Sequence, residues 1–135
     1  MVDVGGKPAS ARRAVAGAEL RMARDTARRL RELPKGDALA AAQLAGIMAA
    51  KRTSELIPLC HPLPLTSIDV RLEVHDDRVE VIASAETVAQ TGVEMEALVA
   101  AAIAGLTVYD MAKAIDKDMT LGGVRLLEKT KERRP

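Results

Sequence analysis

Apolar and polar residues alternate along three stretches of the chain, which is the pattern of a half-buried β-strand. The first stretch is Arg13–Met22, where alanine, leucine and methionine occupy every second position. The second runs from Ile68 to Val74, and the third from Val79 to about Val88. Because a short polar turn joins the second and third stretches, they predict a β-hairpin. His75 falls at the tip of this hairpin, and we assign it no role.

Three other stretches repeat their apolar residues at helical spacing. They predict a short helix over Ala23–Leu33, ended by Pro34, and longer helices from Ala38 to about Thr53 and from Glu94 to about Lys117. Asp37 is a suitable N-cap for the second helix, and the sequence TGVE at 91–94 fits a capping box for the third. The small residues AAAIAG at 100–105 permit close backbone approach, so we expect a neighbouring helix to pack there.

A last strand is predicted over Val124–Glu128, after the turn at Gly122-Gly123. The order strand, two helices, strand, strand, helix, strand favours an α+β fold, specifically a ferredoxin-like, antiparallel four-stranded sheet with helices packed on one face. The length of 135 residues indicates a single domain over 1–135. We expect residues 1–11 and 129–135 to be flexible, because the first segment contains glycine and proline and the second is highly charged.

Composition narrows the class of protein. The chain has one Tyr and no Phe or Trp, so aliphatic residues must form the core, and we expect the subunit to gain burial by forming an oligomer. Basic residues (20) nearly balance acidic ones (19), which argues against a nucleic-acid or membrane-surface binder. One cysteine and two histidines cannot complete a structural zinc site, and we predict no metal and no cofactor. We find no apolar run of membrane-spanning length and no signal-peptide pattern, so we expect a cytoplasmic protein.

The stretch Leu56–Leu65 contains three prolines, which exclude a helix and push each preceding residue toward an extended conformation. In an extended segment successive side chains point to opposite faces. Leu59 and His61 would then share a face, with Cys60 on the other. A histidine held this firmly suits proton-transfer chemistry, although a histidine that simply satisfies its hydrogen bonds in an apolar connector is the other interpretation.

Two charged residues continue an apolar stripe on the last predicted helix. Asp110 and Lys113 follow Val99, Ile103 and Leu106 at helical spacing. They form either a salt bridge near an exposed helix end or part of a buried site.

Further cations are Lys35, Lys51 and Arg52, although the last two also fit ordinary helix-end chemistry. Lysines near the helix N-terminus at Met95 would suit a multiply charged phosphate. There is no P-loop and no GxGxxG motif. The residues alone therefore predict an anion-binding α+β domain that could perform acid–base chemistry.

Longer motifs carry a resemblance to a known family. They are Lys51-Arg52-Thr53, LIPLCHPL at 56–63, TGVEMEAL at 91–98, and LTVYDM at 106–111 with Lys113. In this order they resemble the cyclic pyranopterin monophosphate synthase (MoaC-type) family of molybdenum cofactor biosynthesis. The similarity extends from MVDV at 1–4 to VRLL at 124–127. It departs at the ends, where Gly5 replaces a common hydroxyl residue and KTKE at 129–132 replaces a glycine-rich tail.

This resemblance implies a phosphorus–oxygen lyase that converts 3',8-cyclo-7,8-dihydroguanosine 5'-triphosphate, a small purine-derived molecule, into cyclic pyranopterin monophosphate with release of diphosphate. It also implies a hexamer, built as a trimer of dimers, with active sites at the subunit interfaces. By motif, the catalytic residues would be Asp110, Lys113 and Lys35, the last on a shorter Lys-Gly-Asp match, and either lysine could be the general acid. The matched substrate-binding positions are Leu59, Cys60, His61, Met95, Glu96 and Lys51.

The alternative is a non-catalytic nucleotide-sensing module of ferredoxin-like fold. A sensor needs anion-binding residues but no converging acid–base group. The position of Asp110 beside Lys113 favours the enzyme.

Overall fold

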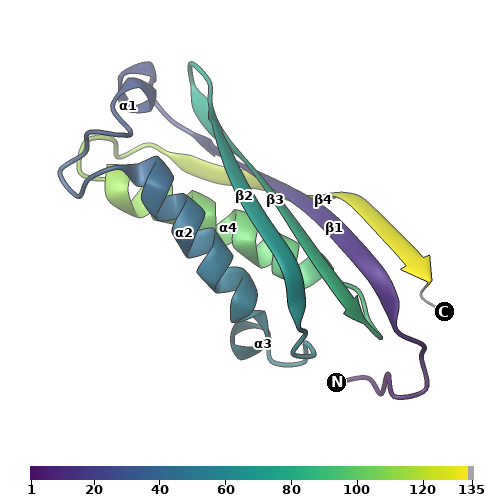
Figure 1. Ribbon diagram of the computed structural model, residues 1–135. Helices are drawn as coiled ribbons and strands as arrows, with labels where there is room; N and C mark the ends of the chain where they lie inside the picture. The colour runs from purple at the N-terminus through teal and green to yellow at the C-terminus, as the bar shows by residue number, and fades with distance from the viewer. Residues whose placement is uncertain (134–135) are drawn as a thin grey trace.

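The computed structural model describes residues 1–133. Their four strands form one antiparallel sheet of order β2-β3-β1-β4. The strands are β1 (Ser10–Arg21), β2 (Leu65–Val74), β3 (Arg78–Ala89) and β4 (Thr120–Arg133). The helices are α1 (Arg24–Arg28), α2 (Ala38–Lys51), α3 (Thr53–Leu56) and α4 (Glu94–Ala112). The long helices α2 and α4 pack side by side on one face of the sheet (Figure 1). The predicted ferredoxin-like α+β fold is confirmed.

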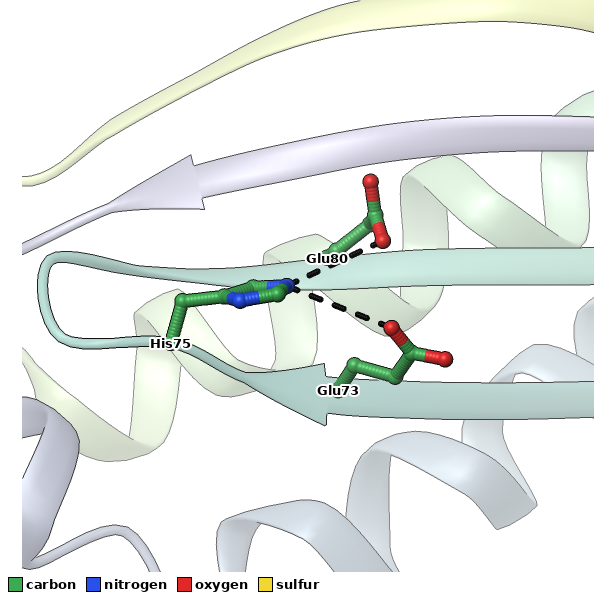
Figure 2. A group of neighbouring side chains, drawn as sticks. All are labelled: Glu73, His75 and Glu80. Carbon is green, nitrogen blue, oxygen red and sulfur yellow. Dashed lines mark ion pairs between the residues drawn. The ribbon is translucent and has the colours of Figure 1, made fainter.

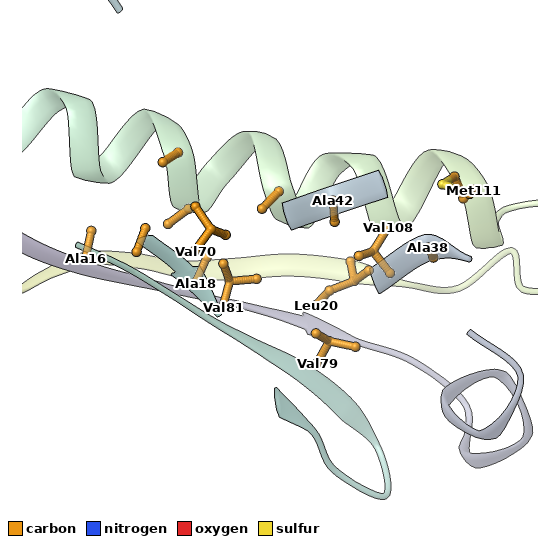
Figure 3. Packing of buried hydrophobic residues seen from close by; sticks show 14 of the residues in the cluster. Ala16, Ala18, Leu20, Ala38, Ala42, Val70, Val79, Val81, Val108 and Met111 are labelled. Atoms are coloured by element: carbon orange, nitrogen blue, oxygen red, sulfur yellow. The ribbon is translucent and has the colours of Figure 1, made fainter. Parts of the chain in front are cut away.

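The core lies between this sheet face and the two long helices, and it consists mostly of alanine and valine (Figure 3). Such small side chains let the backbones approach closely. A Cβ atom added to Gly46 of α2 would lie 3.0 Å from the carbonyl oxygen of Ala100 and 3.3 Å from the Cβ of Ala104. The prediction that a helix packs against residues 100–105 is therefore confirmed.

The expected apolar stripe on α4 faces the core only in part, because Val99 is buried and Ile103 is half-buried. Leu106 is 48% exposed, whereas the buried side of the helix consists mainly of small residues, among them Ala97, Ala100, Ala101 and Ala104. These small side chains allow close packing against α2 and the sheet, and Val108 and Met111 fill the core further along the helix. Leu44 and Met48 of α2 are exposed.

The expectation that no apolar run reaches membrane-spanning length is wrong for helix α4. Its 19 residues are long and apolar enough to cross a bilayer by length and composition. However, 56% of this stretch is buried inside the domain, as expected for a helix that contacts every strand of the sheet and α2. We therefore describe α4 as the core helix of the domain.

Several boundaries differ from the prediction. Helix α1 ends at Arg28 and is followed by turns, and α4 ends at Ala112. The capping box is absent, because Val93 is the N-cap of α4 and no side chain caps it. The carboxylate of Glu94 instead pairs with Lys129, at 3.5 Å from its Nζ.

Parts of the two segments expected to be flexible take part in the sheet. Residues 129–133 continue β4, and Ser10 and Ala11 begin β1, because these two segments pair with each other in the antiparallel register Ser10↔Arg133. Residues 134–135 of the predicted flexible tail lie outside the described residues.

The proline-rich segment does not start as an extended strand. Helix α3 ends at Leu56, and a turn follows in which the backbone N–H of Cys60 donates to the carbonyl of Ile57 at 3.1 Å. The segment becomes irregular only after this turn, from 61 to 64, before β2 begins. The argument that Leu59 and His61 share one face of an extended chain is therefore wrong.

Candidate active site

Three of the predicted site residues form one contact group, which we call the lysine–aspartate cluster: Lys35, Asp110 and Lys113. The Nζ of Lys35 donates to Oδ2 of Asp110 at 2.8 Å, and the Nζ of Lys113 lies 2.9 Å from Oδ1. One carboxylate therefore lies between two ammonium groups. An arrangement of this kind can present positive charge to an anion and can donate a proton.

Local structure explains why these side chains meet. Lys35 belongs to a tight turn closed by the pairing of Leu33 with Gly36, whose φ of +115° favours glycine. Asp37 then caps α2 by accepting hydrogen bonds from the backbone N–H groups of Leu39 and Ala40. The turn and the cap hold Lys35 at the N-terminal end of α2.

Asp110 lies in the last turn of α4, and Lys113 is its C-cap residue. A cation at this position is favoured by the helix dipole. Lys117 lies one turn further, where its Nζ donates to the carbonyl oxygen of Lys113 at 2.7 Å. Lys117 was not predicted as a site residue, although it follows Lys113 at a spacing of four residues in the sequence.

The cluster fixes the charge of its members. Hydrogen bonds from Lys35 and then from Lys113 lower the pKa of Asp110 from 3.8 to about 2. The hydrogen bond and the charge of Asp110 raise the pKa of Lys113 above its usual value of 10.5. At neutral pH Asp110 is therefore a carboxylate and Lys113 is an ammonium group.

The same pKa shift links Asp110 to stability. Because the pKa is lower in the folded protein, the contribution of Asp110 is present above pH 3.8 and is lost as the pH falls toward 2. The side chains of Lys35, Asp110 and Lys113 are 55%, 51% and 55% exposed, so solvent screens this contribution strongly. The cluster is better suited to chemistry than to holding the fold together.

Other predicted site residues lie around the N-terminus of α4, and we call them the proline-segment cluster: Leu59, Cys60, His61, Met95 and Glu96. Glu96 is only 2% exposed, and burial raises the pKa of its carboxyl group. Its Oε1 atom has no hydrogen-bond partner within the described part of the chain. A buried, unpartnered carboxyl group is costly and is typical of a functional site.

Cys60 lies close enough to α4 to be affected by its carboxylates. Burial, followed by the charges of Glu96 and Glu94, raises the pKa of the Cys60 thiol above 9.0. The thiol is therefore neutral at physiological pH, and Cys60 is a poor nucleophile. It is better suited to packing or to a weak contact with substrate.

The remaining predicted residues differ in exposure. His61 is half-buried and lines an open pocket of about 490 Å³ together with Gln90 and Thr91. Met95 is half-buried, whereas Leu59 is exposed. The sequence analysis did not select Gln90 or Thr91, although Thr91 begins one of the motifs that carried the resemblance.

The two clusters lie at opposite ends of α4. Met95 and Asp110 are 15 positions apart on one helix, which corresponds to about 22 Å. Lys51 is exposed and is the last residue of α2, whereas Lys35 precedes the first residue of this helix. The two lysines therefore lie at opposite ends of α2. The structure therefore brings three predicted catalytic residues together, but within one subunit it does not bring them to the predicted substrate-binding residues.

The fold and the lysine–aspartate cluster define a ferredoxin-like α+β domain with a surface site suited to anions and proton transfer. The chain belongs to the MoaC family, whose model matches residues 1–132.

Proteins similar to this chain carry consistent names. The cyclic pyranopterin monophosphate synthase of Roseiflexus sp. (strain RS-1) is 54% identical over 134 residues, which cover 96% of this chain and 85% of that protein. The protein of the same name from Thermomicrobium roseum is 56% identical over 133 residues, with coverage of 96% and 80%. A molybdenum cofactor biosynthesis bifunctional protein of Chlorobaculum tepidum is 52% identical over 132 residues, which cover 96% of this chain and 42% of that protein.

Proposed function

We propose that this protein is a cyclic pyranopterin monophosphate synthase. It acts as a lyase on 3',8-cyclo-7,8-dihydroguanosine 5'-triphosphate, forms cyclic pyranopterin monophosphate and releases diphosphate, an early step of molybdenum cofactor biosynthesis in the cytoplasm. The observation that carries the proposal is the Asp110 carboxylate held between Lys35 and Lys113. Family membership and the names of the relatives support the choice of reaction.

The lysine–aspartate cluster supplies charge and protons to this reaction. Departure of diphosphate develops negative charge, which ammonium groups stabilise. Opening and closing the purine-derived rings requires proton transfers. Asp110, with a pKa of about 2, is a weak base, so its role is to hold and orient the lysines. Lys113 and Lys35 are the proton donors and the contacts to phosphate.

The proline-segment cluster supplies recognition of the substrate's base. A guanine-derived ring presents N–H donors that suit a carboxylate acceptor, and the unpartnered Oε1 of Glu96 could accept such a hydrogen bond. Because Glu96 is buried, a substrate N–H donor left without a partner there would cost binding free energy. The site therefore favours the correct ring over analogues. His61 and Cys60 contribute further contacts from the segment that faces this end of α4.

A complete active site requires two subunits. The two clusters are about 22 Å apart on one chain, too far for both to contact the reacting part of one small molecule. We propose that the lysine–aspartate cluster of one subunit lies beside the proline-segment cluster of another. The exposed apolar residues on the helices, Leu44, Met48 and Leu106, offer surface for such contacts. The assembly we propose is a hexamer, arranged as a trimer of dimers with active sites at the interfaces.

The direct test is incubation of the purified protein with the cyclic triphosphate, with diphosphate and pterin product measured separately. We expect both products to form in equal amounts and the Asp110→Asn protein to form neither. Tight binding of the triphosphate without release of diphosphate would contradict the proposal and would support the nucleotide-sensing module.

A further inference from the structure

The β2–β3 hairpin places two glutamates directly opposite each other. Glu73 pairs with Glu80 in the antiparallel register. Glu80 points to the sheet face opposite the helices, because it alternates with Val79 and Val81, whose side chains are buried on the helix side. Glu73 lies directly opposite Glu80 and therefore points to the same face. Like charges directly opposite on adjacent strands are destabilising. The pairing therefore needs a neutralising group.

A third carboxylate extends this row, and its environment is different. Glu19 of β1 pairs with Glu80 on the other side of β3, so three glutamates lie side by side across three strands. Arginines neutralise Glu19, with Arg78 Nε at 3.3 Å and Arg21 at 3.8 Å. Across residues 1–133, Glu73 and Glu80 have only one ion-pair partner, the imidazole of His75.

His75 points its Nε2 atom between these two carboxylates (Figure 2). The Nε2 atom lies 3.8 Å from Glu80 Oε1 and 4.0 Å from Glu73 Oε2. Both distances exceed those of an N–H···O hydrogen bond. Although the His75 side chain is partly exposed, Nε2 itself is buried and has no hydrogen-bond partner among the residues that the structure describes.

The two distances from His75 Nε2, 3.8 and 4.0 Å, are close to the separation of atoms that share a metal ion. The three ligand atoms all lie within 4.8 Å of one another. Metal–nitrogen and metal–oxygen bonds near 2.1 Å separate two ligands of one ion by about 3–4 Å, depending on the angle between them. One imidazole and two carboxylates form a donor set that suits Zn²⁺ and other divalent first-row metals.

We propose that Glu73, His75 and Glu80 form a binding site for a divalent first-row cation, for which Zn²⁺ is the representative ion. His75 donates Nε2 and each glutamate one carboxylate oxygen, and water completes the coordination. The ion neutralises the facing glutamates and joins β2 to β3 at the tip of their hairpin. The site is independent of the proposed catalytic function, because neither cluster contributes a residue to it.

The test is calorimetric titration of ZnCl₂ into the full-length, tag-free protein after removal of metals with a chelator. We expect one Zn²⁺ per chain. Substitution of a residue that only supports a metal ligand can already weaken metal binding by about 10-fold. His75→Gln and Glu80→Gln each remove a ligand, so each should weaken binding by at least that factor. Zn²⁺ should also raise the melting temperature of the original protein but not of His75→Gln.

Matched variants control for other zinc ligands. His61→Gln removes the other histidine, Cys60→Ser removes the only thiol, and Glu86→Gln removes a glutamate of β3 outside the site; all three should bind Zn²⁺ as the original protein does. The proposal is overturned if no binding is detected with Zn²⁺ at about 1 mM, a concentration at which even a weak site would be occupied. It is also overturned if His75→Gln and Glu80→Gln bind with unchanged affinity, since the zinc would then lie elsewhere.

Discussion

The ammonium group of Lys35 lies 2.8 Å from the carboxylate of Asp110, although 75 residues separate them in the chain. This contact joins the turn before α2 to the last turn of α4. It forms only when the two helices pack together, which depends on the small residues between them. The chemistry we propose is thus linked directly to an alanine- and glycine-rich helix interface.

Removal of the charges in the lysine–aspartate cluster should abolish turnover without unfolding the protein. We expect Asp110→Asn and Lys113→Ala to lower kcat by about 10²–10⁴-fold, the usual contribution of a positioned acid or base. The side chains are about half exposed, so far-UV circular dichroism and the melting temperature should change little. Diphosphate release measures the activity.

Asp69→Asn is the matched control for Asp110→Asn. Asp69 also forms an exposed ion pair, at 3.7 Å from Arg71, but it lies on β2 and outside both clusters. Its loss should leave turnover unchanged. Near-normal turnover in Asp110→Asn would mean that the cluster is an ordinary surface salt bridge.

Glu96→Gln should stabilise the protein at neutral pH while lowering its activity. Burial raises the pKa of Glu96, so the folded state binds an extra proton above pH 4.5, and stability falls as the pH rises through the pKa of the folded state. Relief of a penalty of about 1 kcal/mol would raise the melting temperature by roughly 2–8 °C at pH 7. Below pH 4.5 the difference should shrink, because the original carboxyl group is then protonated in both states.

Glu94→Gln, in the same helical turn, is the control for this effect. Glu94 pairs with Lys129, but its charge also contributes to the raised pKa of Glu96, so its neutralisation should stabilise the protein less than Glu96→Gln does. An equal gain in both variants would show that general reduction of negative charge near α4 is responsible, contrary to our account.

The two adjacent residues of the proline-rich segment should respond differently to substitution. His61→Ala should lower turnover strongly with little change in melting temperature, because the ring is half-buried beside an open pocket. Cys60→Ser should retain much more activity, since the neutral thiol is not a nucleophile at physiological pH. Equal and severe losses in two folded variants would show that both side chains contact the substrate.

Gly46→Val should destabilise the fold. The added Cβ would lie 3.0 Å from the backbone oxygen of Ala100, which cannot move without shifting α4. Overpacking of this kind costs about 1–3 kcal/mol and would be measured by urea denaturation. Ala40→Val, on an exposed position of the same helix, places the same side chain without the contact and should cost much less.

Strands β1, β2 and β3 could be predicted well from the sequence because alternation reports burial directly. Strand β4 is longer than predicted, and it contains Gly122 and Gly123, which were expected to form a turn. The stretch Val79 to Val88 predicted β3, which the structure extends by one residue at each end. The core face of α4 could not be read in this way. Half of its buried residues are alanines, which carry little hydrophobic signal, and the larger residues that formed the predicted stripe include the exposed Leu106.

The small residue Gly105 illustrates the same limit. From the sequence we expected a neighbouring helix to pack against residues 100–105. However, a Cβ atom at Gly105 would lie 2.6 Å from Cδ1 of Leu121 in β4 of the same subunit. A substitution such as Gly105→Leu would therefore disturb the subunit itself.

The candidate site was only partly predictable. The spacing of Asp110 and Lys113 indicated a pair, and the structure adds Lys35 as a direct contact. The distance between Met95 and Asp110 could have been predicted, because both residues fell on one predicted helix. Which surfaces would meet in the proposed oligomer depends on shape, which periodicity along one chain does not report.

Complementation between inactive variants tests the two-subunit active site most directly. Asp110→Asn damages only the lysine–aspartate cluster, and His61→Ala damages only the proline-segment cluster. The two proteins would be co-expressed with different tags, and mixed oligomers would be purified through both tags. A mixture of Asp110→Asn with Lys35→Ala, both in one cluster, is the control and should stay inactive.

The measurement is diphosphate release by the mixed oligomers. If each site takes one cluster from each of two subunits, random assembly leaves both clusters intact in about a quarter of the sites, and about that share of the original activity should return. If both clusters acted within a single subunit, every site would keep one defect. Mixed oligomers as inactive as the two separate variants would therefore contradict the account.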